Sequence, residues 1–571
     1  MAIERKHWLI IGALLLVAAT VRIAVAHWLP NDAPDDGRVY AQMARNMLEQ
    51  HVYSHDTQPP YQPSLIRLPG YPLFLAAIYS VFGHANNGAV RILQALIDTG
   101  TCALIALLAF YWQPDEKKKR ASGFAALALA AVCPFTTIYA ATILTEVLTN
   151  FLLTALFVAV TLAFRSSTTE DTEEDKKKTF RRAVKWWMVA GLLGGLAVLM
   201  RPDSGLFPAA VGLALAGPMI WSAVASAARH RFGSSFDSAQ ITENPKRRRR
   251  FALPAHSKEA WSRMLVSGAL FSFVFVLVLT PWTIRNWRVF HLFQPLAPAH
   301  GEMPGEFVPR GYELWLRTWL DDESYVAPFL WSLDTDPIDI DDVPPSAFDS
   351  PEEKQRVATL LEAYNGESDS DTDENANSQP DANASPDENK EENENDNSNQ
   401  SDQAESDQKP SVEMTPAIDA GFTQLARERI TRHRFKFYVW LPLKRARTMW
   451  FDTHSQYWPF EGTLLPLEDL DYEHHQQIWL PLFAGLTAVY TLLGLAGGWL
   501  LWSSQKFDAR RVLLMTLLAI VLRLTLFSSI ENPEPRYLVE FFPLLSVLGG
   551  IAIGQFGART SLSASRATHA Q

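Results

Sequence analysis

The chain has 571 residues, with 51 Lys and Arg against 62 Asp and Glu, so its formal net charge is −11. This acidity is local, because residues 367–409 alone carry about −13 and the rest of the chain sums to about +2. The distribution excludes an acidic soluble enzyme. The 2 cysteines, Cys102 and Cys133, both lie in apolar runs, which excludes a disulfide framework and a cysteine-based zinc site.

Apolar stretches long enough to cross a membrane recur along the chain. A spanning helix needs about 20 mostly apolar residues, because a rise of ~1.5 Å per residue has to cover ~30 Å of hydrocarbon. The sequence therefore predicts an all-α polytopic membrane protein with about ten spans. They lie near residues 7–27, 88–112, 121–140, 145–164, 185–200, 205–228, 264–284, 478–502, 510–530 and 538–556.

Basic residues gather in alternate loops between these spans. Lys and Arg accumulate in short cytoplasmic loops, and with ten spans every basic stretch falls on the same side. We therefore expect both termini to be cytoplasmic. The stretches are ERK (4–6), KKKR (117–120), KKKTFRR (176–182), KRRRR (246–250) and FDARR (507–511). Residues 1–26 also fit a cleaved signal peptide, and that alternative stays open.

The same count divides the chain into three regions. Residues 1–284 form an N-terminal transmembrane module whose first outer loop is 28–87, and residues 478–571 form a C-terminal one. Residues 285–477 are expected on the outer face, as a small outer domain. Within them, 367–409 hold almost no apolar side chain and should be disordered, because they cannot bury enough surface to offset the entropy of ordering.

Two further apolar stretches are expected at the outer surface. Residues 70–83, GYPLFLAAIYSVFG, are too short to cross and are predicted to form an interfacial or re-entrant helix. Residues 435–451 mix aromatic side chains with Lys and Arg. They indicate either a second interfacial helix or an ordinary helix of the outer domain.

The first outer loop begins with a helix-like pattern around Asp36. Apolar residues recur at helical spacing, which predicts an amphipathic helix on the outer leaflet with Asp36 at its start. Capping of this helix by Asp35 or Asp36 is the local alternative to a chemical role. The apolar stripe is Val39, Tyr40, Met43, Ala44, Met47 and Leu48.

Arginines follow at positions that suit a phosphate. Arg67 precedes a Pro-Gly-Tyr-Pro turn, and a guanidinium at the headgroup level can grip a phosphate with two hydrogen bonds. The alternative is an ordinary positively charged interface anchor. Arg91, at the outer end of the second span, allows the same two interpretations.

Charged residues also end other predicted spans on the outer side. They give an outward surface with acids and arginines close to lipid, although each alone fits a helix end in water. The residues are Glu146, Arg201, Asp203, Arg285, Arg536 and the neighbouring Tyr537.

Three more ionisable residues, Arg22, Asp98 and Arg523, fall inside or near predicted spans. Such groups are costly in lipid and face a cavity or a partner. Asp98 and Arg523 could pair with one another or with other groups.

Several chemistries lack their usual motifs. The chain has no Walker A loop, no Rossmann glycine fingerprint, no HExxH and no GxSxG. No cofactor and no metal ligand is assigned, although carboxylates and water suffice for Mg²⁺ or Mn²⁺, so a divalent cation stays open. Nucleic acid is not expected as a partner.

The order of motifs resembles the membrane-embedded glycosyltransferases of the GT-C fold, in the family-39-like group of protein O-mannosyltransferases and bacterial aminoarabinose transferases. The motifs lie on both ends of the membrane region, and their order carries the resemblance. They are DGRVY (36–40), RLPGYPLFLA (67–76), FGHANNGAVRILQ (82–94), LTEVLTNF (144–151), MRPDSGLFP (200–208), PWTIRNW (281–287) and PRYLVEFFP (535–543).

The resemblance implies a GT-C-like helical bundle with a polyprenyl-phosphate sugar as donor and inverting transfer on the outer face. By the same resemblance Asp36 is the expected catalytic base, and Glu146 is a second acid that orients the acceptor or Arg67. Arg67 is expected on the donor phosphate, with Arg285, Arg536 and Tyr537 as further candidates. Asp35, Tyr40, Arg91 and Arg201 are other candidates. Relatives carry Asp-Glu where this chain has Asp36-Gly37, so the role of that second acid does not transfer.

Two other functions are weighed against this hexosyl- or pentosyltransferase. A transporter or flippase of lipid-linked sugars would account for the spans, but related halves with interrupted helices are not seen in the sequence. A non-catalytic scaffold is the other. The basic loops and the type of relative favour a bacterial inner membrane with a periplasmic site.

Overall fold

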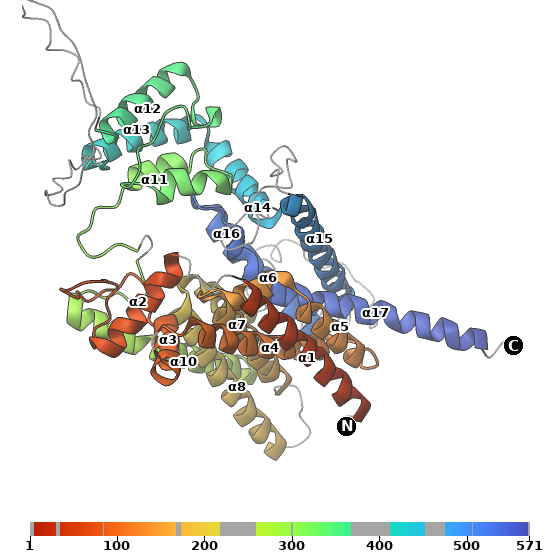
Figure 1. Ribbon diagram of the computed structural model, residues 1–571. Coiled ribbons are helices and arrows are strands. Elements are labelled where there is room, and N and C mark those ends of the chain that lie inside the picture. The colour runs from red at the N-terminus through yellow and green to blue at the C-terminus, as the bar shows by residue number, and fades with distance from the viewer. Residues whose placement is uncertain are drawn as a thin grey trace, which may run out of the picture. The chain divides into compact units, whose positions relative to one another are not determined.

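The computed structural model describes residues 5–29, 35–83, 85–166, 173–216, 258–298, 301–366, 412–451, 474–504 and 506–568. These residues form helices joined by turns and loops (Figure 1). The α-helices are α1 (Arg5–Trp28), α2 (Asp35–Glu49), α3 (Gly70–Phe82), α4 (Asn87–Trp112), α5 (Lys119–Ala131), α6 (Pro134–Thr137), α7 (Glu146–Ser166), α8 (Glu173–Met200), α10 (Lys258–Phe290), α11 (Arg310–Leu316), α12 (Pro351–Tyr364), α13 (Pro416–Arg432), α14 (Leu441–Phe451), α15 (His474–Ser503), α16 (Phe507–Ser528) and α17 (Phe542–Thr568). Short 3₁₀ or π segments are η1 (Ile138–Ala141), η2 (Pro202–Gly205), η4 (Glu323–Tyr325), η5 (Ala327–Trp331), η6 (Pro345–Ala347), η7 (Lys436–Trp440) and η9 (Pro535–Phe541).

The protein is an all-helical polytopic membrane protein, as the sequence predicts. Among the described residues 8 helices are long and apolar enough to cross a membrane, or 9 if α5 and the α6–η1 segment count as one span bent by 53°. Nine of the ten predicted spans coincide with these elements. For the tenth, predicted at 205–228, residues 206–216 are helical and the remainder lies outside the described residues.

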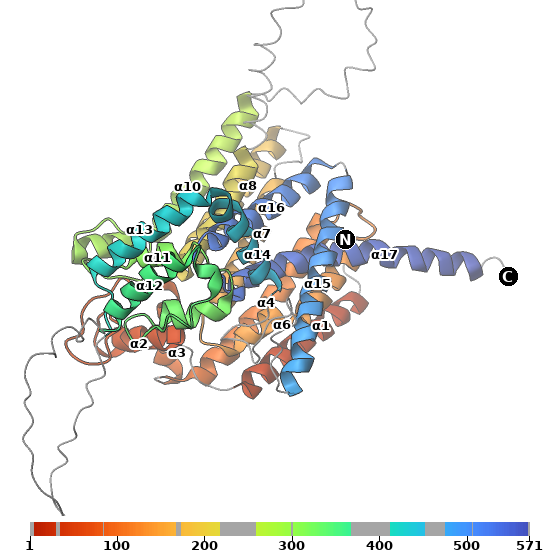
Figure 2. The same ribbon diagram turned by 90° about the horizontal axis from the view of Figure 1, so that it is seen from above.

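Small residues set the closest helix contacts around α17. A Cβ atom added to Gly550 would lie 2.4 Å from Cβ of Ala126, and one added to Gly554 would lie 2.3 Å from Oγ of Ser122. Both partners are on α5, so these glycines let the backbones of α17 and α5 approach as small residues do between membrane helices. The N-terminal half of α17 therefore lies at the centre of the bundle, against α4, α5 and α15 (Figure 2).

A buried ion pair joins α1 and α4 and identifies the partner of Asp98, which the sequence left open. Asp98 on α4 accepts a hydrogen bond from Nε of Arg22 on α1 at 2.6 Å, and both side chains are buried. Arg22 also donates to the backbone carbonyls of Ala130 and Ala131 at 3.0 and 3.1 Å. Of the two alternatives that the sequence left open for Asp98 and Arg523, pairing with other groups is the one observed, because Arg22 lies beside Asp98 and Arg523 pairs with Asp203 and Glu540.

The first loop holds the two short helices that the sequence predicts. Helix α2 begins at Asp35, and its apolar stripe buries Met43 and Ala44 completely. Helix α3 is apolar and has 13 residues, too few to cross a membrane. The two helices pack together, with the rings of Tyr40 and Tyr71 edge to face at 5.2 Å between centroids. This contact fixes the start of α2, where Asp36 lies.

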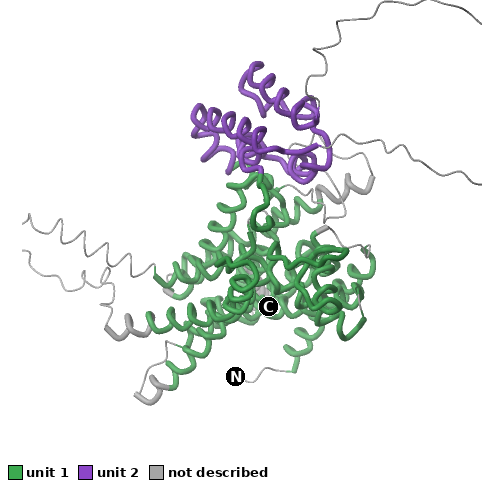
Figure 3. The backbone as a smooth tube through the Cα atoms, turned by 90° about the vertical axis from the view of Figure 1, so that its left-hand side faces the viewer, with its two compact units in different colours: residues 1–308, 443–571 green, residues 309–442 purple. Residues whose placement is uncertain are grey.

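The chain forms two compact units (Figure 3). Unit 1 comprises residues 1–308 and 443–571 and contains every candidate span. Unit 2 comprises residues 309–442, and its core surrounds Trp315, Trp319 and Phe422. Unit 2 lies within the residue range 285–477 that the sequence predicts as an outer region, and the place of this region on the outer face stays a prediction.

Two other predictions concern the helix at 435–451 and the acidic insert at 367–409. Residues 435–451 are helical, in η7 and α14, and their place at a membrane surface stays a prediction. The insert 367–409 lies outside the described residues.

Candidate functional site

The side chain of Asp36 lies between two arginines from distant parts of the chain. Its Oδ1 accepts from Nη2 of Arg67 at 2.9 Å, and its Oδ2 accepts from Nη1 of Arg536 at 3.3 Å. About a quarter of the Asp36 side chain and about a third of that of Arg67 stay exposed, whereas Arg536 is largely covered. The carboxylate therefore pairs with two cations at a surface that a ligand can reach.

The turn before α3 holds Arg67 in place. A Cβ atom added to Gly70 would lie 2.5 Å from the backbone oxygen of Leu199, so only a glycine lets this turn lie against the end of α8. Tyr53 adds a second anchor, because its hydroxyl donates to the backbone oxygen of Arg67 at 3.0 Å. Its ring packs edge to face on Trp282 at 5.2 Å. The sequence RLPG thus fixes the position of Arg67 relative to α8 and α10.

Arg536 is held by an acid two residues earlier. Nε of Arg536 lies 2.7 Å from Oε1 of Glu534, whose side chain is fully buried. Pro535 begins η9 between them, and this segment leads directly into α17. Glu534, Arg536, Asp36 and Arg67 therefore form one chain of alternating charge from the interior to the surface.

A second charge network lies deeper, around Arg201 at the end of α8. Nη1 of Arg201 contacts Oε1 of Glu146 at 2.6 Å and Oε1 of Glu540 at 3.7 Å. Its Nε donates to Oδ1 of Asp203 at 3.2 Å. Arg523 on α16 pairs with the same Asp203 and, at 2.9 Å, with Glu540. Two arginines and three acids thus join the ends of α7, α8, α16 and α17.

Tyr537 lies between the two networks. The guanidinium carbons of Arg201 and Arg536 lie 5.7 and 5.5 Å from the centroid of its ring, within the range of cation–π attraction. Its hydroxyl accepts from Nδ2 of Asn532 at 3.1 Å. The ring therefore contacts one arginine from each network.

Burial and nearby charges shift the pKa values of the ionisable groups around Asp36. Burial alone would raise the pKa of Asp36, but the nearby Arg536 and Arg67 outweigh it and lower that pKa below its usual value. Burial raises the pKa of Glu534 to about 7, only partly opposed by Arg536. Burial also raises the pKa of Tyr40 to about 12. At neutral pH Asp36 is therefore a carboxylate, Tyr40 is neutral and Glu534 is close to its midpoint.

Other predicted site residues have different partners. Glu146 pairs with Arg201 rather than with Arg67. Arg285 donates to the backbone oxygen of Ser64 at 2.7 Å and lies within 5.0–5.5 Å of the ring centroids of Tyr53, Trp282 and Phe290.

Arg91 donates to the backbone oxygen of Leu29 at 2.8 Å. The side chain of Asp35 lies outside the described part of the chain. The catalytic and phosphate-binding roles of all these residues stay predictions.

Three acids at the site have no role predicted from the sequence: Asp203, Glu534 and Glu540. Glu540 is fully covered and meets both Arg201 and Arg523. A signal was present, because ENPEPRYLVEFFP (531–543) carries glutamates into an apolar segment, and ionisable residues there need a partner. The identity of each partner required the structure.

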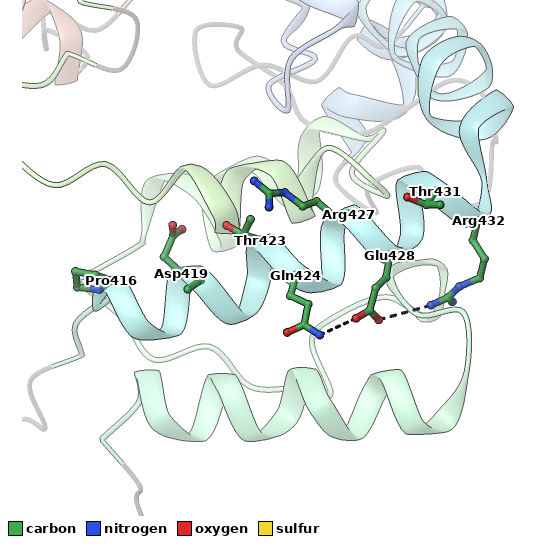
Figure 4. A pocket seen from close by; sticks show the side chains of 9 residues that line it. Pro416, Asp419, Thr423, Gln424, Arg427, Glu428, Thr431 and Arg432 are labelled. Carbon is green, nitrogen blue, oxygen red and sulfur yellow. Dashed lines mark hydrogen bonds and ion pairs between the residues drawn. The ribbon is translucent and has the colours of Figure 1, made fainter.

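A more voluminous pocket lies elsewhere, in unit 2. It has a volume of about 910 Å³ and follows one face of α13 in unit 2 (Figure 4). Its side chains pair among themselves, as Gln424 donates to Glu428 at 2.9 Å and Arg432 lies 4.0 Å from the same acid. Such pairs are typical of a solvated helix face, so no site is assigned there.

No group of three or more His, Cys, Asp and Glu side chains among the described residues is placed to hold a metal ion.

Comparisons with known proteins give one result. No family model matches the chain, and no curated protein matches it either. In structure the chain is similar to ArnT from Cupriavidus metallidurans. The crystal structure bound to undecaprenyl phosphate has 13% identity and a TM-score of 0.33, covering 97% of this chain and 79% of ArnT.

The apo crystal structure of ArnT gives similar values, with 13% identity, a TM-score of 0.34, and coverage of 96% and 78%. TM-scores of this size define no correspondence between individual residues. The function is therefore argued from the residues of this chain.

Proposed function

We propose that this protein is an inverting glycosyltransferase that moves a sugar from a polyprenyl-phosphate donor to an acceptor. The observation that carries the proposal is the carboxylate of Asp36 between Arg67 and Arg536, at 2.9 and 3.3 Å. The reaction needs a base next to cations that bind phosphate, and it needs them at the edge of a membrane. The bundle of spans and the sequence motifs around these residues support the same function.

Asp36 acts as the base in this reaction. Its carboxylate takes the proton of an acceptor hydroxyl or amine, and the acceptor oxygen or nitrogen forms a bond to the anomeric carbon of the sugar. The bond between that carbon and the phosphate oxygen breaks on the opposite face, so the configuration inverts. A positioned general base contributes about 10²–10⁴-fold to such a step.

Arg67 and Arg536 act on the leaving group. Polyprenyl phosphate departs with one more negative charge than it carried in the donor, and cations fixed in advance stabilise that charge. Arg536 is fixed by Glu534, and Arg67 is fixed by its turn. Both guanidinium groups can therefore receive the phosphate without a large rearrangement.

Donor binding also prepares the base. Without a ligand both arginines lower the pKa of Asp36, which makes its carboxylate a weak base. A donor phosphate competes for the same two guanidinium groups. As they turn to the phosphate, the pKa of Asp36 rises and the carboxylate becomes a better proton acceptor, so the base is strongest when the donor is bound.

We propose that the membrane is a bacterial inner membrane, that both termini are cytoplasmic and that the site faces the periplasm. The acceptor is a lipid, a glycan or a protein. This orientation is supported by the distribution of basic loops.

The decisive experiment incubates the purified protein in lipid vesicles with a panel of radiolabelled polyprenyl-phosphate sugars. We expect sugar release or transfer by the wild type, and its loss in Asp36→Asn and Arg67→Ala. Equal lipid binding by all three proteins without turnover would overturn the proposal in favour of a transporter of lipid-linked sugars.

A further inference from the structure

A polar pocket lies away from the candidate site, at the other end of α7. It has a volume of about 210 Å³ and is here called the basic pocket. The residues that line it come from the ends of α4, α5, α7 and α16 and from the loop between α4 and α5. The charged ones are Glu116, Lys119, Arg165, Lys506, Asp508 and Arg511.

Its depth in the membrane follows from helix geometry. Helix α7 begins at Glu146 in the candidate site and reaches Arg165 at the basic pocket. At ~1.5 Å per residue these two positions are roughly 30 Å apart, the thickness of the hydrocarbon layer. Trp112 and Tyr111 at the end of α4 are the residue types that gather at a membrane–water interface. The basic pocket therefore lies at headgroup level on the face opposite Asp36.

The charge of the basic pocket suits an anion. Four cationic side chains line it against two carboxylates, those of Glu116 and Asp508. Lys119 is paired with Glu116, and Lys506 donates to the backbone oxygen of Pro114. Two arginines, Arg165 and Arg511, complete the set, and the pocket keeps an excess of positive charge after its own carboxylates are counted.

Aromatic rings hold both arginines in position. The guanidinium carbon of Arg165 lies 5.0 Å from the ring centroid of Tyr111, and that of Arg511 lies 4.5 Å from the ring centroid of Phe164. A guanidinium over a ring is held in one orientation, and its planar fork of N–H groups matches the oxygen pair of a phosphate. Ordinary basic loop residues need no such support, so this arrangement goes beyond the usual excess of cations at a membrane surface.

We propose that the basic pocket binds the phosphate of an anionic phospholipid headgroup. Basic pockets between membrane helices at headgroup level are a known form of lipid recognition. A bound lipid here would join the ends of α4, α7 and α16 and stabilise the bundle on the face away from the candidate site. The inference does not depend on the proposed catalytic function.

The test compares lipids on the purified full chain in detergent. Phosphatidylglycerol should raise the thermal unfolding midpoint and remain bound in native mass spectrometry, while zwitterionic phosphatidylcholine should do neither. Arg165→Gln and Lys506→Gln remove exposed cations of the pocket and should keep the fold. Each should weaken phosphatidylglycerol binding by about tenfold or more, as expected for the loss of a charge-assisted contact.

Arg510→Gln is the matched control. Arg510 is next to Arg511 in the chain, but its guanidinium lies 5.3 Å from the ring centroid of Trp502 and it does not line the pocket. This variant should bind phosphatidylglycerol as the wild type does. An equal response of all variants would overturn the proposal. Inorganic phosphate that raises the midpoint as much as the lipid, and displaces it, would overturn the lipid as the source of the phosphate.

Discussion

Asp36 and Arg536 are separated by 500 residues in the chain, and their side chains lie 3.3 Å apart. Arg67, which is 31 residues from Asp36, completes the contact at 2.9 Å. The first loop and the last span thus meet at one carboxylate. This relationship is the basis of the predictions on activity that follow.

Removal of the proposed base should abolish transfer without unfolding the protein. In Asp36→Asn we expect kcat to fall by about 10²–10⁴-fold, because an amide cannot accept the acceptor's proton. The measurement is radiolabelled sugar transfer together with the thermal unfolding midpoint. Glu49→Gln is the control, since it removes one negative charge from the exposed end of the same helix. Near-normal turnover by Asp36→Asn would reject the assignment.

Loss of either arginine that is proposed to bind phosphate should weaken binding of the donor. We expect Arg67→Gln and Arg536→Gln each to raise the donor KM by about 10–100-fold, the size of a lost charge-assisted hydrogen bond. Initial rates against donor concentration measure this change. Arg38→Gln removes an exposed charge from the same region and should leave KM unchanged. If the control and the two site variants behave alike, bulk charge and not these contacts governs donor binding.

Glu534 should make donor binding depend on pH. Its pKa of about 7 means that it is mostly protonated below that pH, where it no longer neutralises Arg536. An anionic donor binds that protonated form better, so donor KM should rise as pH increases through about 7. In Glu534→Gln the side chain stays neutral, and KM should remain low and flat across the range. Coincident KM profiles for wild type and variant would contradict this role.

The charge network around Arg201 should stabilise the folded protein. Arg201→Leu leaves Glu146, Asp203 and Glu540 without one of their cations, and breaking a buried ion pair costs about 3–5 kcal/mol. Thermal unfolding in detergent should show a clearly lower midpoint.

The control for this network is Arg356→Gln, which breaks the half-exposed pair with Glu428 and should cost less than ~1 kcal/mol. Equal midpoints for the two variants would mean that the Arg201 network adds no stability.

Helix contact around α17 can be tested with two glycines. In Gly550→Ala the new methyl group would lie 2.4 Å from Cβ of Ala126, and such overpacking costs about 1–3 kcal/mol. Gly485→Ala on α15 meets no atom within 4 Å and should be neutral or slightly stabilising. A lower midpoint confined to Gly550→Ala is the expected result. No difference between the two would show that α5 and α17 can separate without loss.

The sequence predicted the spans well because a membrane helix is a local feature. Its length and apolar composition follow from the thickness of the hydrocarbon layer, so windows of the sequence are enough. The amphipathic start of α2 and the short α3 were predicted for the same reason. The bend between α5 and α6 was not predicted, since it falls within one continuous apolar stretch.

The sequence did not predict which charged side chains pair with one another. The sequence put Asp36, Arg67, Arg201 and Arg536 among the candidate residues, yet it left open whether Asp98 pairs with Arg523. It also assigned no role to Glu534. A charge in an apolar segment signals that a partner exists, but its identity depends on which helix ends meet.

A multi-span helical membrane protein with acids and arginines at the ends of its helices thus follows from the amino-acid sequence alone. The packing of the helices is needed to know that Asp36 lies between Arg67 and Arg536, that Glu146 pairs with Arg201, and that Arg285 lies among aromatic rings. The two kinds of feature differ in the distance along the chain over which they act. Hydropathy acts over one helix length, whereas an ion pair forms between whichever side chains the packing of helices brings within about 4 Å.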